Sequence, residues 1–423
     1  MGDLQPADVD VAVVGAGVIG VACALQLARQ GLRVQVFDPD GVGQGASFGN
    51  AGHLATEQVF PIADLSILKR LPGMLLDPMG PLRLDWTYLP RAIPWFLRLL
   101  LNLRAAPFAR TVAGLRALNE ASLGAWRRLL QAIERPDLLR EDGSLLVYEQ
   151  DASRAALQAL QARMAGQGVP VESWGAEAVH AAAPQLSEGI RGGLFFPATG
   201  HFIDPHRVVV ELARAAEALG VTFHRQRVLD GHRLAGGVAL RLDDGSLRAR
   251  QVLLACGAHS APLTERLTAT RVPLDTERGY HLMLPREQGR LPFAVTSFER
   301  RFIMTPMAGG LRLAGTVEFA GLEKPANMPR AWQLHRLSQG LFRDELDTEG
   351  ASPWMGFRPS LPDSLPIIDR VGEGRVLLAF GHQHLGLTQA AVTAEYIGQL
   401  AQGQAVAGLE AYRLGRFGGP ARG

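Results

Sequence analysis

The stretch Val11-Ala-Val-Val-Gly15-Ala-Gly17-Val-Ile-Gly20 decides the fold, because a short β-rich run leads through a glycine-rich turn into a helix-like run. Gly15 permits the tight turn, Gly17 lets the backbone approach a pyrophosphate, and Gly20 lets the helix pack closely on the strand. A second β-rich run then ends at Asp38, whose carboxylate can accept hydrogen bonds from a ribose diol. The stretch therefore predicts a βαβ unit that binds a dinucleotide at the N-terminus of its helix.

Length and charge narrow the class of protein. A chain of 423 residues is too long for one compact core, so we expect two domains. The 43 basic and 41 acidic residues leave a net charge of +2, which gives no electrostatic argument for nucleic acid binding. Two cysteines, Cys23 and Cys256, form no disulfide framework, and no metal-binding motif is visible.

Targeting signals are also missing from the sequence pattern. The first residues have neither a basic region nor an apolar region of the kind that a secretory signal peptide needs. No run reaches the roughly 18 uninterrupted apolar residues of a membrane-spanning helix. We therefore expect a cytoplasmic protein.

The loop from Pro39 to His53 follows the βαβ unit and contains five glycines. Such a loop brings the backbone close to a ligand, although it could also be a flexible surface connection. A nicotinamide-dependent dehydrogenase of the usual kind would not need it. The loop thus favours a different dinucleotide.

At the segment Ser47-x-x-Asn50-Ala51-Gly52 the chain resembles the D-amino-acid oxidase and dehydrogenase superfamily of flavoproteins, and is most similar to the bacterial D-amino-acid dehydrogenases. The later motif Gly356-x-Arg358-Pro359 and the strand that ends at Cys256-Gly257 match the same superfamily in the expected order. The resemblance covers nearly the whole chain and is weakest from 62 to 186. It implies FAD as the cofactor. No cysteine lies in the C-terminal motif, so we expect the flavin to be bound non-covalently.

The resemblance also implies an α/β fold in which a Rossmann-like FAD-binding domain is joined to an α+β substrate domain built on an antiparallel sheet. We expect the chain to pass between the two domains several times. The FAD-binding domain would comprise 1–61, 193–267 and 351–423, and the substrate domain would comprise 62–192 and 268–350.

The motifs of the family, carried over to matching positions, give the expected cofactor-binding residues. They lie in the glycine turn, the loop after Asp38, two central strands and the start of the last helix. The set is Gly15, Gly17, Val18, Ile19, Gly20, Asp38, Pro39, Gly45, Ala46, Ser47, Asn50, Ala51, Gly52, His53, Val228, Cys256, Gly257, Gly381, His382, Leu385, Gly386, Leu387 and Thr388.

Oxidation of an amine next to a carboxylate requires a hydride acceptor, a cation for the carboxylate and a neutral amine. Arg358 suits the carboxylate, because a planar guanidinium can hold it with two parallel hydrogen bonds. Tyr280 and His53 are the other expected catalytic residues. His281, His382 and His384 are further candidates for tuning the amine proton, although a structural role is the simpler interpretation of each histidine.

Several alternatives stay open at this point. The substrate is a small amino acid, most simply a D-amino acid, with glycine, sarcosine or an imino acid as the alternatives. The chain could also be the flavoprotein subunit of a hetero-oligomer that passes electrons to a partner protein. A nicotinamide-dependent dehydrogenase is a further class, and it predicts a colourless protein.

The run from Ala92 to Leu103 is apolar except for a narrow polar stripe formed by Arg98 and Asn102 together with the preceding Arg91. Burial between the two domains is the interpretation that we favour. The competing interpretation is a face that touches anionic lipid at the inner membrane, where a quinone could accept electrons.

Overall fold

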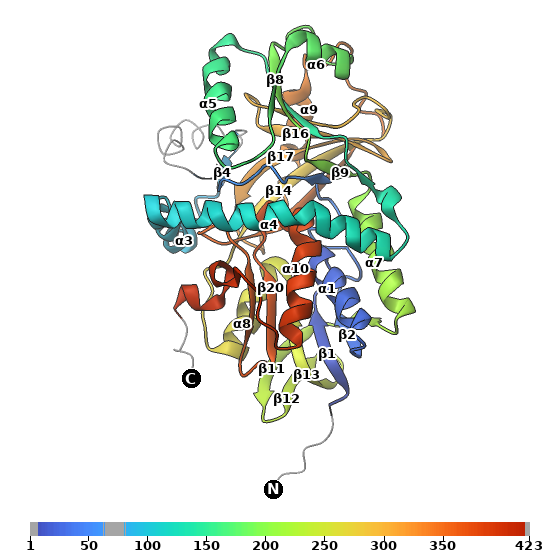
Figure 1. Ribbon diagram of the computed structural model, residues 1–423, viewed down its shortest axis with the longest axis vertical. Helices are drawn as coiled ribbons and strands as arrows, with labels where there is room; N and C mark the ends of the chain where they lie inside the picture. Colours follow the sequence, from blue (N-terminus) through green and yellow to red (C-terminus); the bar gives the residue numbers. More distant parts are fainter. Residues whose placement is uncertain (1–6, 62, 64–79, 81, 419–423) are drawn as a thin grey trace.

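The computed structural model describes residues 7–61, 63, 80 and 82–418. Two large sheets lie one above the other in Figure 1, and the long helix α4 (Ala105–Ala132) crosses between them. The glycine-rich turn belongs to the lower sheet. Helices α5 (Arg154–Ala165), α6 (Ala176–Ala182) and α9 (Pro329–Ser338) lie around the upper sheet.

The lower sheet has a parallel core. Its parallel neighbours follow the order β10 (Thr222–His224), β2 (Val34–Phe37), β1 (Val9–Val14), β13 (Ser246–Leu254) and β20 (Val376–Phe380). Antiparallel partners extend it: β12 (Gly237–Leu242) pairs with β13, β11 (Val228–Leu234) pairs with β12, and β19 (Ile367–Val371) pairs with β20. Strands from three distant parts of the sequence therefore build this one sheet.

Helices cover both faces of the lower sheet, which explains why its central strands are apolar on both sides. One face packs against α1 (Val18–Arg29), α7 (Pro205–Ala218) and α10 (Gly386–Ala401), and the other packs against α8 (Ser260–Thr268). Helix α7 begins at Pro205, and the side chain of Asp204 caps it by accepting a hydrogen bond from the amide of Arg207 at 3.0 Å.

The upper sheet is mainly antiparallel. It follows the order β18 (Ser352–Ser360), β14 (Asp275–Leu284), β17 (Gly310–Phe319), β16 (Phe302–Met307), β15 (Ala294–Ser297), β6 (Ser144–Tyr148), β8 (Gly192–Phe196) and β7 (Glu172–Gly175). Among the described strands of this upper sheet, only the pairs of β15 with β6 and of β17 with β4 (Leu82–Leu84) are parallel.

Shorter elements connect the two sheets. A small third sheet contains β3 (His53–Leu54), β9 (Gly200–Phe202) and β5 (Leu139–Arg140). The remaining elements are α3 (Leu89–Asn102) and the 3-10 helices η1 (Pro136–Leu138), η2 (Asp151–Ser153), η3 (Gly257–His259), η4 (Gln383–Leu385), η5 (Leu409–Tyr412) and η6 (Leu414–Phe417).

The expected fold class, a Rossmann-like domain joined to a domain built on a largely antiparallel sheet, is confirmed. The sheets divide the chain somewhat differently from the expected segments. Strand β18 pairs with β14 over Ser352–Ser360, so the upper sheet extends past residue 351. Strands β6, β7 and β8 belong to the same sheet, so the start of the segment 193–267, expected in the FAD-binding domain, lies in the upper sheet.

Helix α3 corrects the expectation that its apolar residues are buried between the domains. Ala92 and Trp95 are buried, and the indole of Trp95 donates a hydrogen bond to the carbonyl of Ser360 at 3.2 Å. The side chains of four others are open to solvent, with exposed fractions of 46% for Ile93, 57% for Leu97, 44% for Leu100 and 54% for Leu101. The helix packs along one edge only and leaves an apolar face uncovered by the described residues.

No helix in the described part of the chain combines the length and the apolar character needed to cross a bilayer.

Candidate active site

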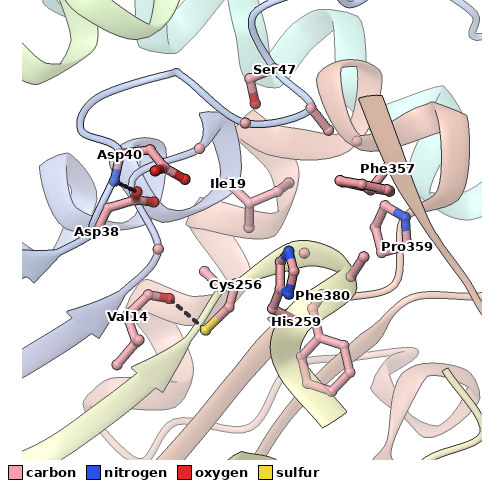
Figure 2. A pocket seen from close by; sticks show the side chains of 18 of the residues that line it. Val14, Ile19, Asp38, Asp40, Ser47, Cys256, His259, Phe357, Pro359 and Phe380 are labelled. Atoms are coloured by element: carbon pink, nitrogen blue, oxygen red, sulfur yellow. Dashed lines mark hydrogen bonds between the residues drawn. The ribbon is translucent and has the colours of Figure 1, made fainter. Parts of the chain in front are cut away.

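A cavity of about 880 Å³ opens at the carboxyl ends of the parallel strands, where open α/β sheets bind their ligands. Its walls come from the glycine turn and following loop, from 227–230 and 255–266, and from 379–387. Strand β18 of the upper sheet closes it, and Figure 2 shows Phe357 and Pro359 of that strand across the cavity from Val14 and Asp38. Both domains therefore contribute to the cavity.

The glycine turn has the backbone geometry that its sequence predicts. Gly15 has a φ of 106°, and a Cβ at this position would lie 2.4 Å from the carbonyl oxygen of Ala255 on the neighbouring strand. A Cβ on Gly20 would lie 1.9 Å from the carbonyl oxygen of Gly15. Glycine is thus required at both positions, and Gly20 serves helix packing rather than the cavity surface.

Two side chains fix the loops around the N-terminus of α1. The hydroxyl of Ser47 accepts a hydrogen bond from the amide of Val18 at 2.9 Å. The Asp38 carboxylate accepts hydrogen bonds from the amides of Ala16 at 2.9 Å and Asp40 at 3.0 Å. Each carboxylate oxygen keeps a second lone pair for a ribose hydroxyl. Asp38 can therefore hold both the turn and a nucleotide.

A second helix N-terminus reaches the cavity at α10, where Gly386 and Leu387 line the wall. The indole of Trp126 on α4 donates hydrogen bonds to the carbonyls of Leu387 and Thr388 at 2.9 and 3.1 Å, and the Thr388 hydroxyl accepts one from the amide of Ala55. These contacts fix the helix start. Its free amides and dipole provide a positive environment for an electron-rich group.

The upper sheet holds the loop at Gly49 and Asn50. His281 Nδ1 donates to the carbonyl of Gly49 at 2.8 Å, and an Arg312 Nη1 donates to the carbonyl of Asn50. The His281 ring stacks on Trp354 with 5.0 Å between ring centroids. This loop is therefore positioned jointly by the two domains.

The structure brings most of the expected cofactor-binding residues to one cavity. The following expected residues line it: Gly15, Gly17, Val18, Ile19, Asp38, Pro39, Gly45, Ala46, Ser47, Asn50, Val228, Cys256, Gly257, Gly381, His382, Gly386 and Leu387. The expected residues that lie outside its wall are Gly20, Ala51, Gly52, His53, Leu385 and Thr388.

His53 forms a buried pair behind this wall. Its Nε2 lies 2.9 Å from Glu57 Oε1, and its Nδ1 lies 3.2 Å from the carbonyl oxygen of Gly200. Burial opposes the charged imidazole, but the Glu57 carboxylate outweighs it and raises the pKa of His53. Both ring nitrogens have a hydrogen-bond partner, so His53 is suited to fixing β3 against β9 and to placing a positive charge near the cavity.

Arg358 lies on β18, on the side of the strand away from the cavity wall. Its guanidinium lies against Gly279, where a Cβ would approach Cζ to 2.3 Å, and Nη1 donates to the carbonyl of Thr316 at 3.2 Å. Thr316 has a φ of 58°, a strained value for a β-branched residue, which turns this region out of regular strand geometry. Burial lowers the pKa of Arg358, while the nearby Glu277 carboxylate opposes that effect.

The Arg358 guanidinium is a half-buried cation with donors to spare. Among the described residues, no carboxylate oxygen lies within 4 Å of the Arg358 guanidinium. The Glu277 carboxylate accepts a hydrogen bond from the hydroxyl of Ser360 at 2.5 Å. Arginine has five N–H donors, and a buried charge needs compensation. The arrangement is therefore that of an anion-binding group.

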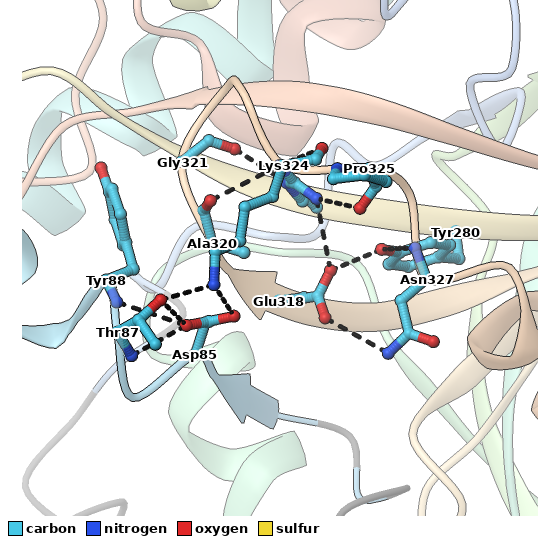
Figure 3. Close-up of polar contacts among 11 residues, drawn as sticks. Asp85, Thr87, Tyr88, Tyr280, Glu318, Ala320, Gly321, Lys324, Pro325 and Asn327 are labelled. Atoms are coloured by element: carbon cyan, nitrogen blue, oxygen red, sulfur yellow. Dashed lines mark hydrogen bonds and ion pairs between the residues drawn. The ribbon is translucent and has the colours of Figure 1, made fainter.

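Tyr280 belongs to a separate polar network (Figure 3). Its hydroxyl donates to Glu318 Oε2 at 2.5 Å and accepts from the amide of Asn327 at 3.2 Å. The buried Arg278 donates to the carbonyls of Gly321, Lys324 and Pro325 in the same loop. Tyr280 is 1% exposed and does not line the cavity, and these contacts suit a role in fixing the loop.

The sequence pattern missed several cavity residues. Trp354 and Phe357 flank the glycine of the Gly-x-Arg-Pro motif, but they are three residues apart, so strand alternation does not predict that both line one cavity. His259, Arg227 and Arg266 also line the wall, but nothing in their local sequence distinguishes them from surface residues. The tertiary fold brings these three residues to the same cavity.

The lower sheet, its glycine turn and the cavity closed by a second sheet define a two-domain oxidoreductase that uses a dinucleotide. A protein-family model described as FAD dependent oxidoreductase (DAO) matches residues 10–400, and the chain belongs to this family. FAD is therefore the cofactor of this enzyme.

Similar proteins agree with that assignment. The chain is 33% identical to a D-amino-acid oxidase of Bradyrhizobium diazoefficiens over 93% of this chain and 95% of that protein. It is 31% identical to a D-amino acid dehydrogenase of Paramagnetospirillum magneticum over 93% and 95% of the two chains. The fold is similar to that of a glycine oxidase from Geobacillus kaustophilus, with a TM-score of 0.74, 22% identity and coverage of 97% and 99%.

The site fits FAD by its own chemistry. The N-terminus of α1 and the glycine turn suit the pyrophosphate, Asp38 suits the ribose, and the N-terminus of α10 suits the electron-rich part of the isoalloxazine. Gly17 keeps the approach open, because a Cβ there would lie 3.3 Å from the Ser47 hydroxyl.

Proposed function

We propose that this enzyme oxidises the carbon–nitrogen bond next to the carboxylate of a small amino acid, and that its preferred substrate class is D-amino acids. The observation that carries the proposal is Arg358, a half-buried guanidinium that forms no ion pair within 4 Å in the described part of the chain. A substrate carboxylate would complete its hydrogen bonds. The names of the relatives, which include a D-amino-acid oxidase and D-amino acid dehydrogenases, support the stereochemical part.

One bound FAD is enough for the two-electron oxidation of one amino acid. When bound, FAD supplies the oxidant, taking a hydride from the α-carbon. The amine loses one proton as the carbon–nitrogen double bond forms, and water then hydrolyses the imino acid to an oxo acid and ammonia. Arg358 would orient the substrate by holding its carboxylate, which fixes the face of the α-carbon that is presented for oxidation.

Glycine, sarcosine and imino acids form the second substrate class. Structures with similar folds include a glycine oxidase and an L-proline dehydrogenase from P. horikoshii, the latter with a TM-score of 0.70 and 16% identity. A screen of both enantiomers of the common amino acids, with glycine, sarcosine and proline, for anaerobic bleaching of the flavin would distinguish the classes.

Substitution of Arg358 tests the assignment of the carboxylate site. Arg358→Ala should lower kcat/KM for the best amino acid by a factor that corresponds to about 2 to 5 kcal/mol, while the bound FAD remains. Arg191→Ala, at an exposed arginine before β8, is the matched control and should change kcat/KM by less than about twofold. An unchanged kcat/KM for Arg358→Ala would refute the assignment.

We also propose that the exposed face of α3 binds an anionic membrane surface, where a lipid-soluble quinone could accept the electrons. Leu97 and Leu101 are more than half exposed on this helix, and Trp86, just before it, is 58% exposed. The stretch from Trp86 to Asn119 contains five arginines and no carboxylate. This combination of apolar and basic residues suits an interfacial helix.

Leu97→Glu tests the membrane proposal better than a change at Leu99, which packs against a buried cluster around Trp95 and Phe319. The holoenzyme should sediment with anionic vesicles in a salt-sensitive manner, and Leu97→Glu should abolish sedimentation without lowering the melting temperature. Leu219→Glu, at a 51% exposed leucine after α7, should leave sedimentation unchanged. If the protein ignores vesicles but reduces a purified partner protein, α3 is not a membrane face.

A further inference from the structure

His384 lies at the start of α10, in the turn between the cavity wall and the helix. Its neighbours Gln383 and Gly386 line the cavity, whereas His384 itself does not. The turn is held in one conformation, because Gln383 has a φ of 51° and its amide donates to the carbonyl of Leu361 at 3.1 Å. His384 and Arg358 therefore share one property: each lies next to residues of the cavity wall without belonging to it.

The two nitrogens of the His384 ring differ in their partners. Nε2 contacts the side-chain carbonyl oxygen Oε1 of Gln58, which can only accept a hydrogen bond, so Nε2 carries the proton. Nδ1 is therefore an acceptor. It is buried and has no hydrogen-bond partner in the described part of the chain. A buried acceptor without a partner on the chain can accept a hydrogen bond from a ligand or from a water molecule.

The other three histidines that the sequence pattern singled out already have partners. His53 contacts Glu57 and Gly200, His281 contacts Gly49, and His382 Nε2 lies 3.0 Å from the hydroxyl of Thr393. Of these four side chains, His384 is the one with a buried ring nitrogen left unpaired.

The charges around His384 keep the ring neutral. Burial lowers its pKa to about 3, and the positive charges of Arg358 and His53 act in the same direction. His384 thus remains a hydrogen-bond acceptor beside a guanidinium donor. An α-amino acid presents the complementary pair, a carboxylate that accepts and a nitrogen that donates.

We propose that Nδ1 of His384 accepts a hydrogen bond from the amino group of the substrate, while Arg358 binds the carboxylate of the same molecule. The proposal rests on the amino acid oxidation proposed above and deepens it. Gln58 is then a positioning residue, because its carbonyl oxygen fixes the proton on Nε2 and leaves the lone pair of Nδ1 free for the amine. Recognition of both groups would explain how the site distinguishes amino acids from simple carboxylic acids.

The test compares two ligands and two variants of the FAD-loaded enzyme. D-Alanine carries both groups, whereas propanoate lacks the amine. The dissociation constant of D-alanine is obtained from the concentration dependence of the rate of anaerobic flavin reduction, and that of propanoate from the shift in the spectrum of the oxidised flavin. His384→Leu removes the acceptor at similar bulk. His384→Asn keeps a polar atom near the place of Nδ1 and is the conservative control.

His384→Leu should weaken D-alanine binding by about ten- to a hundredfold and change propanoate binding by less than about threefold. His384→Asn should recover most of the loss. Equal weakening of both ligands would overturn the inference, because His384 would then merely shape the pocket, and so would unchanged D-alanine binding. If the wild-type enzyme binds propanoate but not D-alanine, the inference fails and the carboxylate role of Arg358 stands. If it binds neither ligand, the proposed function fails as well.

Discussion

His281 of the upper sheet donates a hydrogen bond from Nδ1 to the carbonyl of Gly49 in the cofactor loop, at 2.8 Å. A Cβ on Gly49 would lie 2.2 Å from the ring of Trp354, on which His281 stacks. The loop that reaches the cavity wall at Asn50 is therefore fixed by the upper sheet, whereas the glycine turn in the same wall belongs to the lower sheet.

Removal of this contact should weaken cofactor binding. His281→Ala leaves the Gly49 carbonyl without its donor, and a lost buried hydrogen bond costs about 1 to 3 kcal/mol. We expect the dissociation constant for FAD to rise by roughly tenfold, measured by titration of the apoprotein with fluorescence detection. His232→Ala, at an exposed histidine in β11, should leave it unchanged. An equal change in both variants would contradict the role of His281.

Acid should destabilise the protein through its buried neutral histidines. Burial lowers the pKa of His281 and of His382 to about 3, against an ordinary value of 6.5. Between pH 6.5 and pH 3 these imidazoles take up protons in the unfolded chain but stay neutral in the folded protein. The stability that they contribute above about pH 6.5 is therefore lost as the pH falls toward 3. His53 acts in the opposite direction, because its raised pKa gives stability that is lost only as the pH rises.

The melting temperature of the holoenzyme should therefore fall by several degrees between pH 6.5 and pH 5. His382→Gln should reduce this fall, because the variant has one fewer buried imidazole that must stay neutral. Identical pH profiles for the two proteins would exclude His382 as a source of the acid sensitivity.

FAD should be released without breaking a covalent bond. Burial and the nearby Asp38 carboxylate raise the pKa of Cys256 to about 12, so its thiol is a poor nucleophile even though it lines the cavity. Cys23 is fully buried in α1. Precipitation with trichloroacetic acid should leave the yellow colour in the supernatant, and a yellow pellet would show a covalent link.

Tyr280→Phe separates a structural role from a catalytic one. The change removes the donor to Glu318 and should lower the free energy of unfolding by about 1 to 3 kcal/mol. If the network only fixes the loop from 320 to 327, kcat/KM should change by less than about threefold. A hundredfold loss of kcat/KM with an unchanged melting temperature would instead support the catalytic role that the sequence pattern suggested.

The sequence predicts the cofactor cavity better than the substrate site, for a physical reason. The glycines, Asp38 and Ser47 act through local backbone geometry, and local geometry leaves a recognisable spacing. The surroundings of Arg358 depend on strand register, which places Gly279 and Thr316 next to it. Such pairings between distant strands have no local signature.

The same limit applies to helix α3. An apolar run with a few arginines is compatible with a buried helix or with an exposed one, because periodicity shows which residues share a face but not what covers that face. Only the tertiary arrangement shows that Leu97 and Leu101 are uncovered by the described residues.

The order of strands in the lower sheet also bears on how the protein is made. Strand β13 lies between β1, formed by residues 9–14, and β20, formed by residues 376–380. During synthesis on the ribosome, one edge of β13 and one face of α1 stay uncovered until residues 376–401, which form β20 and α10, have emerged. We therefore expect that FAD is loaded only after residues 376–401 have folded, and that a nascent chain stalled before them would expose the apolar surface that α10 later covers.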